Sequence, residues 1–418
     1  MTAADRLLAF VLQLTRTSVL GCISTNYVQD NSWNLAFLKW SCQTFLEIKA
    51  TLDPHDDPND TARTFLCEGV VKRLAPFPRD ATGALMVARF QNGTVIRWDQ
   101  ANQMGVELGM PIWPLGVVSV ENDRRTVEAT ADEYMLQDCK NTFSCDDLVW
   151  TIRAGVNAAA RRGDATHGNI TAFLNTDRKR LNRENEPFLP GCSVPCGHCQ
   201  PCVGPNTMVE EGANPILEGG IVIASNVLDM LLQDQLIATT EGTSNGSSSR
   251  STTVISIFPA VPVAWDEARF FHLRCLSGFV VSAVRKGGAT AWAEVISEGG
   301  RSPLVIEADF GRAAAAGGAA AAAGGPAGGG YEPTLSAPPG VKLVTAGQQR
   351  WELVGLKAGE SAILCGSAAD CSNSASADDL FVVEPLVGNA SEYNYYGWGE
   401  TAQRAIFGAA VAAAGGTD

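Results

Sequence analysis

Apolar residues recur at helical intervals in the first half of the chain and alternate with polar residues in much of the second half. Around residues 33–48 the apolar positions follow a helical spacing, and Pro and Asp residues then break the pattern at 54–60. Strand-like alternation over 84–98 and a turn-rich apolar loop at 110–116 interrupt the helical half. Further helices are predicted at 61–74, 121–140, 145–161 and 220–236.

From residue 254 onward the pattern changes to short alternating segments, which are typical of strands. Lys286-Gly287-Gly288 lies between two of these segments and is a hairpin signal. The predicted strands are 254–258, 279–284, 292–296, 341–344, 350–354, 361–365 and 380–383. The fold class predicted is therefore multidomain, with helices first and an antiparallel β-domain after them.

Segments of low apolar content predict the domain boundaries. A helical domain covers 1–237 and includes a long, Cys- and Pro-rich loop at 190–205. The Gly/Ser/Thr-rich stretch that follows predicts a linker at 238–253. The β-domain covers 254–387, and its Ala/Gly insertion at 311–330 is predicted to be disordered because it cannot build a packed core. The tail 388–418 is left unassigned.

Charge and length exclude several classes of protein. The 418 residues are enough for two or three domains, and the net charge of -14 argues against nucleic-acid binding, which needs a basic face. No apolar run reaches the ~18 residues that a membrane span requires, so no membrane span is expected. The oligomeric state stays open.

Twelve cysteines point toward disulfides and a secretory route. Four of them crowd together as Cys192, Cys196, Cys199 and Cys202, which is compatible with either a zinc site or disulfides, and we favour disulfides because the run is one continuous loop. Cys365 and Cys371 bracket a short loop that suits a disulfide.

Five N-x-[ST] sequons, at Asn59, Asn92, Asn169, Asn245 and Asn389, add modest weight to the secretory route. The apolar segment 7–14 lacks a cleavage site and is interpreted as a buried helix rather than a signal peptide. We expect a secreted, disulfide-containing glycoprotein.

Glu218 stands beside Gly219 and Gly220 at the start of a strongly apolar helix. A helix N-terminus carries free N–H groups and partial positive charge, and glycine lets a ligand approach closely. The alternative interpretation is a Gly-Gly turn before a buried helix.

Three segments resemble glycoside hydrolase family 95, the α-L-fucosidase-like enzymes. Residues 206–233 are similar to the family's "DGNFG…MLLQS" stretch, and residues 257–283 are similar to its "FPALPxAW…LRARGGFxV" stretch. Residues 30–40 are similar to its "DTNYDLALLRW" helix, and the three segments occur in the family's order. The resemblance implies the second half of an (α/α) helical barrel followed by an antiparallel β-sandwich-like domain.

The resemblance also implies a reaction, namely inverting hydrolysis of terminal α-L-fucosyl or related α-L-sugar residues on an oligosaccharide or glycan, without a cofactor or metal. Glu218 occupies the position of the general-base aspartate. Asn26 stands where the general-acid glutamate is expected, and an amide cannot donate that proton. Asp30 is the candidate substitute, although it is equally placed to cap the following helix.

Other residues are predicted to contact substrate. Trp98 and Trp113 would stack on sugar faces, or else belong to the core. Gly219, Gly220 and Asn206 would line the pocket. Alternatives to an enzyme are a glycan-binding pseudoenzyme that has lost the acid, and a disulfide-rich structural protein of the cell wall.

Overall fold

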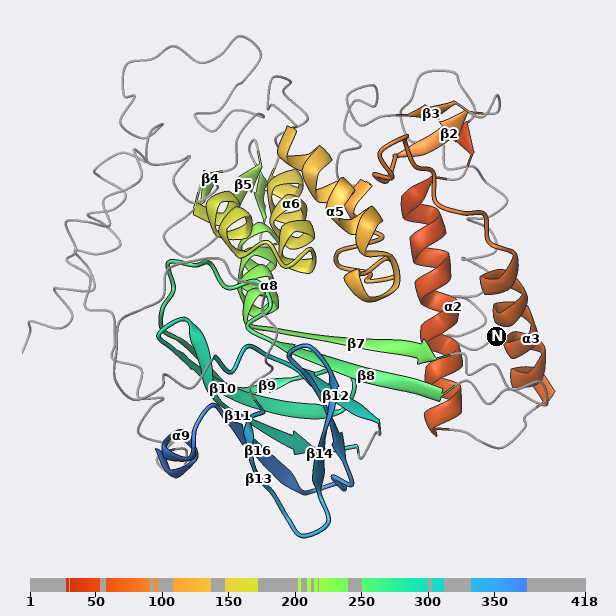
Figure 1. Ribbon diagram of the computed structural model, residues 1–418. Coiled ribbons are helices and arrows are strands. Elements are labelled where there is room, and N and C mark those ends of the chain that lie inside the picture. Colours follow the sequence, from red (N-terminus) through yellow and green to blue (C-terminus); the bar gives the residue numbers. More distant parts are fainter. Residues whose placement is uncertain are drawn as a thin grey trace, which may run out of the picture.

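The computed structural model describes residues 28–29, 31–52, 58–90, 94–96, 108–136, 147–171, 202–203, 209–211, 214–216, 218–239, 250–299, 303–311 and 332–373. Within these ranges, helices come first and two mostly antiparallel sheets follow, as predicted (Figure 1). The helices are α2 (Ser32–Leu52), α3 (Pro58–Arg73), α5 (Val120–Leu136), α6 (Asp147–Ala159), α8 (Glu218–Leu231) and the short α9 (Ala368–Asn373). A further helical segment covers 163–171.

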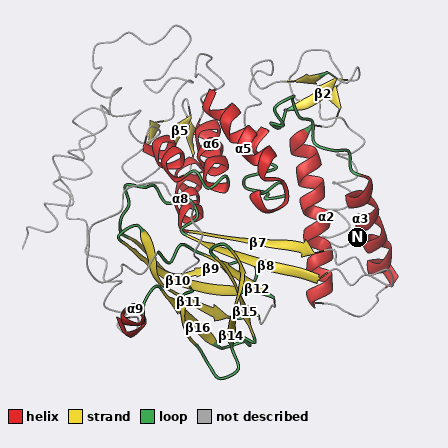
Figure 2. Ribbon diagram, viewed as in Figure 1, coloured by secondary structure: helices red, strands yellow, loops and turns green. Residues whose placement is uncertain are grey.

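The helical layer lies on one side of the sheets (Figure 2). Helices α5, α6 and α8 stand side by side, and α2 packs against α3. Asn31 caps α2, because its side-chain oxygen accepts a hydrogen bond from the Asn34 N–H at 3.2 Å. The capping role considered for Asp30, which is outside the described residues, therefore belongs to Asn31. Pro58 opens α3, a position at which its missing N–H costs nothing.

Two five-stranded sheets build the β part. One has the order β13-β16-β11-β10-β9, and the other β14-β15-β12-β8-β7. Their strands are β7 (Leu232–Thr239), β8 (Arg250–Ile257), β9 (Ala268–Arg274), β10 (Phe279–Lys286), β11 (Ala289–Ser297), β12 (Leu304–Glu307), β13 (Thr334–Ser336), β14 (Lys342–Gly347), β15 (Arg350–Val354) and β16 (Ser361–Cys365).

The two large sheets share one hydrophobic core. Buried side chains of both meet in it, among them Val281, Val295 and Leu364 from one sheet and Ile255, Ile306 and Leu353 from the other. Such face-to-face packing is the sandwich-like arrangement that the family resemblance implies. The β10–β11 hairpin closes at Gly287 and Gly288, whose φ values of 57° and 79° are those of a tight hairpin turn.

Small sheets accompany the helices. β1 (Val28–Gln29), β2 (Ala88–Phe90) and β3 (Val95–Ile96) form one of them. β4 (Cys202–Val203), β5 (Val209–Glu211) and β6 (Asn214–Ile216) form the other.

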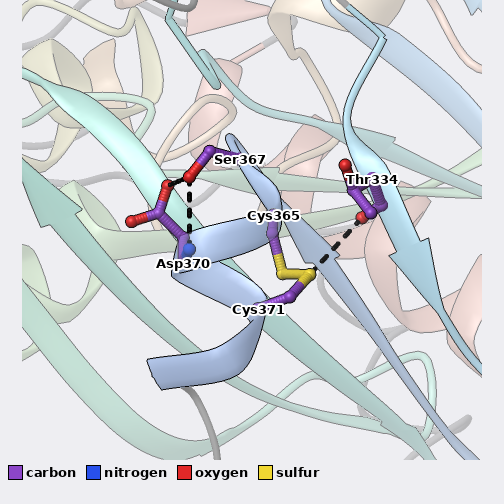
Figure 3. Close-up of a disulfide and its surroundings, with 5 residues drawn as sticks. All are labelled: Thr334, Cys365, Ser367, Asp370 and Cys371. Atoms are coloured by element: carbon purple, nitrogen blue, oxygen red, sulfur yellow. Dashed lines mark hydrogen bonds between the residues drawn. A yellow bond between two sulfur atoms is a disulfide. The ribbon is translucent and has the colours of Figure 1, made fainter.

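The predicted disulfide between Cys365 and Cys371 is present (Figure 3). It joins the end of β16 to α9, with a Cα–Cα distance of 5.4 Å. Ser367 caps α9 by accepting a hydrogen bond from the Asp370 N–H at 3.2 Å, and the Sγ of Cys371 lies 4.0 Å from the carbonyl oxygen of Thr334. The disulfide therefore holds α9 beside the edge of its sheet.

The helix predicted at 220–236 is too long. α8 ends at Leu231 and the chain continues directly as β7. The backbone N–H groups of Phe258 and Ala260 donate to the carbonyls of Leu231 and Met230, at 2.7 and 3.2 Å, and β7 then pairs with β8. The pairing of residues 232–239 with β8 thus outweighs the helical spacing of the leucines in this segment.

The linker predicted at 238–253 is too long at both ends, because strands occupy its first and last residues. β7 extends to Thr239, and β8 begins at Arg250, where Thr252 and Thr253 suit a strand although they are polar.

Strands β9, β12 and β13 were not predicted, since they are mostly exposed or short. β12 pairs with β8 in parallel, a departure from the antiparallel expectation.

Several predictions lie outside the described residues. These are the strand 380–383, the tail 388–418, the segment 7–14, and all but the first position of the Ala/Gly insertion 311–330. Of the four crowded cysteines only the backbone of Cys202, in β4, is described, so the choice between zinc and disulfides stays a prediction. Asn169 is described and is 5% exposed, which makes its sequon inaccessible in the folded chain.

An ionic cluster joins the helical layer to a sheet. Arg161, which follows α6, pairs with Glu121 of α5 at 2.7 Å and with Glu307 of β12 at 2.6 Å. Arg350 of β15 pairs with the same two carboxylates, at 2.6 and 2.9 Å, and Ser256 of β8 donates to Glu307 at 3.1 Å. Two guanidiniums and two carboxylates therefore neutralise one another at the interface.

The conformation of Arg161 shows how the cluster is built. Its φ of 61° is left-handed, a conformation that glycine usually supplies at the end of a helix. The backbone N–H groups of Arg161 and Arg162 donate to the carbonyls of Ala158 and Asn157, both at 2.9 Å, which closes the end of α6. An arginine occupies this position, and its side chain reaches both carboxylates.

Glu121→Gln is expected to destabilise the fold by about 3 kcal/mol at pH 7, because Glu121 is only 7% exposed and both guanidiniums would lose a charged partner. Although burial opposes it, hydrogen bonds and charge from Arg350 and Arg161 lower the pKa of Glu121. Its stabilising contribution is therefore complete above pH 4.5 and is lost as the pH falls through the lowered value. Urea unfolding at several pH values measures this.

The matched control is Glu128→Gln, which removes an exposed pair with Arg124 at 3.5 Å and should cost about 0.5 kcal/mol or less. Equal losses for the two variants would show that the cluster does not hold the layers together.

Candidate functional site

The structure places Glu218 at the first position of α8, with Gly219 and Gly220 in the same turn. This confirms that the three residues open the apolar helix, while the placement of their side chains is not described. Asn26, Asp30, Trp98 and Asn206 lie outside the described residues. Trp113 is thus the predicted substrate-binding residue whose side-chain surroundings the structure does describe.

Trp113 lies in the turn-rich segment 110–116 and is half-buried against the helical core. A Cβ added to Gly155 of α6 would come within 2.2 Å of the indole carbon Cδ2, so the ring rests directly on the helix backbone. Its indole N–H donates to Oδ2 of Asp229 at 2.5 Å. The α6 backbone therefore covers part of the ring, which agrees with the core interpretation better than with free stacking on a sugar.

Asp229, one of the last residues of α8, is the titratable group that this contact reveals. Burial and the charge of nearby Asp234 together raise its pKa to about 6, while the hydrogen bond from Trp113 opposes the shift. A carboxyl group with such a pKa can hold and release a proton near neutral pH. A general acid requires a pKa of this kind. A buried carboxyl group with only a structural role can have one as well.

A second carboxyl group, that of Asp234 in β7, lies near Asp229. Its Oδ2 accepts a hydrogen bond from the Ser277 N–H at 2.9 Å, which ties β7 to the β9–β10 turn. Burial and the charge of Asp234 together raise the pKa of the neighbouring Cys275 thiol. The thiol is therefore neutral at physiological pH and does not act as a nucleophile there.

Two polar side chains of α8, those of Asn226 and Asp229, face inward. Asn226 donates to the carbonyl of Thr151 at 2.8 Å, and Gln233, just after the helix, donates to the carbonyl of Ala158 at 2.8 Å. Together with Asp229 they recur at helical spacing on the side that faces α6 and Trp113. Sequence reasoning missed Asp229, and the available signal was a lone carboxylate within an otherwise apolar helix.

Glu218 and Asp229 cannot form one inverting pair. They lie eleven residues apart in a continuous helix, so their backbones are about 16 Å apart along its axis. An inverting pair places its carboxyls about 6.5–9.5 Å apart. The two ends of α8 therefore carry two separate groups, and any acid partner of Glu218 must come from another element.

Within the described ranges, no three His, Cys, Asp or Glu side chains gather as metal ligands. No helix in this part of the chain has the length and apolar character of a membrane span. No protein-family model matches the chain, and no curated protein matches it with significance.

Asp229→Asn is expected to change the pH dependence of stability. Because the folded pKa is raised, the folded state holds the proton more tightly than the unfolded state. Stability should fall by about 2–3 kcal/mol between roughly pH 4 and pH 6 through this group alone. The asparagine keeps an oxygen for Trp113 but cannot ionise, so this slope should disappear in urea unfolding curves. Asp132→Asn removes a charge from an exposed ion pair with Arg162. This variant should show the same fall of stability with pH as the native chain.

Gly155→Ala should destabilise the fold by about 2 kcal/mol, because the new methyl group overlaps Trp113 and displaces it from Asp229. Thermal unfolding and the fluorescence of the tryptophans measure the effect. Gly168→Ala is the matched control, since it adds the same methyl group to a helical segment with no heavy atom within 4 Å. Equal stability of the two variants would contradict the packing of Trp113 on α6.

Proposed function

We propose that this chain is a glycoside hydrolase-like protein resembling family 95, which acts on terminal α-L-fucosyl or related α-L-sugar residues of glycans by inverting hydrolysis. One observation carries the proposal. The two segments with the strongest resemblance, 206–233 and 257–283, meet at the junction between the helices and the sheets, where Phe258 and Ala260 donate to the carbonyls of Leu231 and Met230.

Further contacts at this junction support the proposal. The Val263 N–H donates to Asp164 at 3.0 Å, and Trp265 packs edge-on against His167 with ring centroids 5.5 Å apart. A Cβ on Gly163 would come within 2.5 Å of the Ala260 carbonyl oxygen, so the helical segment 163–171 and the 258–265 loop touch backbone to backbone. The 258–265 loop thus supports the C-terminal end of α8, the helix that begins at Glu218.

Exposed apolar residues on the helices support a partial (α/α) barrel. Trp33 and Trp40 of α2 are more than a third exposed, as are Ile221 and Leu228 of α8. Helices of a barrel layer bury two faces, one against the inner ring and one against a neighbour. Apolar outward faces suit helices that belong to a larger layer than the one described.

In the proposed reaction Glu218 is the general base that removes a proton from the attacking water. Water approaches the anomeric carbon opposite the leaving oxygen, and a second carboxyl protonates that oxygen. Asn26 cannot supply the proton, so Asp30 is proposed as the acid. Asn31 provides a cap of α2.

The alternative function is a glycan-binding pseudoenzyme. The amide of Asn26 at the expected acid position favours it, because a site without its acid keeps shape and binding while it loses hydrolysis. Both the hydrolase and the pseudoenzyme are proposed to be secreted and glycosylated and to bind a glycan.

Glu218→Gln should abolish hydrolysis of an aryl α-L-fucoside, by roughly a thousandfold or more, and leave binding of a fucosylated oligosaccharide nearly intact. NMR of the first product should show the inverted anomer. Glu298→Gln, the same change at an exposed ion pair in the β part, should leave the rate unchanged.

Binding without hydrolysis by the native chain would select the pseudoenzyme. If the native chain neither binds nor hydrolyses fucosides, the proposed function is wrong.

A further inference from the structure

Two buried thiols meet between α2 and α3. Cys42 of α2 is 1% exposed and Cys67 of α3 is 2% exposed, and both are free. The two helices pack against each other, and the two thiols interact with one another. A disulfide between them needs Cα atoms within about 7 Å and a sulfur–sulfur distance of about 2 Å.

The helix pair is held in register around these thiols. Figures 1 and 2 show α2 and α3 side by side, and the two helices contact each other. Lys49 of α2 donates to Oγ1 of Thr64 in α3 at 3.0 Å, which fixes a second point of the same interface. The remaining free thiol among the described residues, Cys275, is buried in the core of the β part instead.

We propose that Cys42 and Cys67 are a disulfide-forming site that links α2 to α3 when the chain meets a disulfide oxidant, such as oxidised glutathione or a dithiol–disulfide exchange protein. The proposal is independent of the proposed function, because it needs no substrate. A covalent link here would stabilise the pair of helices α2 and α3.

The chemistry balances as thiol–disulfide exchange. One of the two thiols loses its proton and attacks one sulfur of oxidised glutathione, the S–S bond breaks, and one glutathione thiolate leaves. The other thiol then gives up its proton, and its sulfur attacks the protein sulfur of the mixed disulfide, which releases the second glutathione thiolate. Two protein thiols lose two electrons in all, and one glutathione disulfide gains them.

Either thiol can make the first attack, and the other then resolves the mixed disulfide. Because both are buried, exchange occurs as the hairpin opens or while the chain folds.

The test maps the cysteines of the full native chain after incubation with oxidised or reduced glutathione. Free thiols are blocked with N-ethylmaleimide in denaturant, and the peptides are analysed by mass spectrometry. A cross-linked peptide pair that contains Cys42 and Cys67 should appear in the oxidised sample, and both residues should be alkylated in the reduced one. Alkylation of both in an oxidised sample whose Cys365–Cys371 disulfide is intact would overturn the proposal, as would bonds from either to another cysteine.

Variants separate this link from the chain's other cysteines. Cys67→Ser should leave Cys42 alkylated under oxidising conditions, whereas Cys275→Ser should leave the cross-link unchanged. The Cys42→Ser/Cys67→Ser chain should lose about 5 °C in Tm under oxidising conditions compared with Cys275→Ser, because the link closes a loop of moderate length. If the serine variants do not fold, the peptide map of the native chain still decides.

Discussion

The cluster of Glu121, Arg161, Glu307 and Arg350 is the interaction on which the arrangement of the two layers depends. It places four charges at an interface where each carboxylate meets two guanidiniums. Unpaired, these charges would make the contact between helices and sheet unfavourable. Paired, they fix α5 and α6 over β12 and β15, and so they decide where α8 can pass from the helical layer into β7.

The position of α8 then explains the unusual state of Asp229. The helix turns Asn226 toward α6 and leaves Ile221 and Leu228 exposed. Burial raises the pKa of the carboxyl to about 6 while the indole of Trp113 binds it. Glu218, at the other end of the same helix, meets the conditions of a helix N-terminus instead. One helix thus carries a carboxyl residue at its first position and another near its last.

Cysteine has different roles in different parts of the chain. Cys365 and Cys371 close a short segment, Cys42 and Cys67 interact between helices, and Cys275 is neutral in a core. Spacing along the sequence reveals the first kind, because the two residues are near neighbours in the chain. The second kind depends on a contact between helices that no spacing encodes.

The sequence by itself determined the order of helices and strands, the hairpin at Gly287 and Gly288, and the opening of α8 at Glu218, because these depend on local periodicity and backbone preference. Tertiary structure decided what local pattern cannot. It ended α8 at Leu231 by pairing the next residues with β8, and it placed Trp113 on Asp229. Long-range hydrogen bonds and burial outweighed propensity at these points, since both require segments that lie far apart in the sequence.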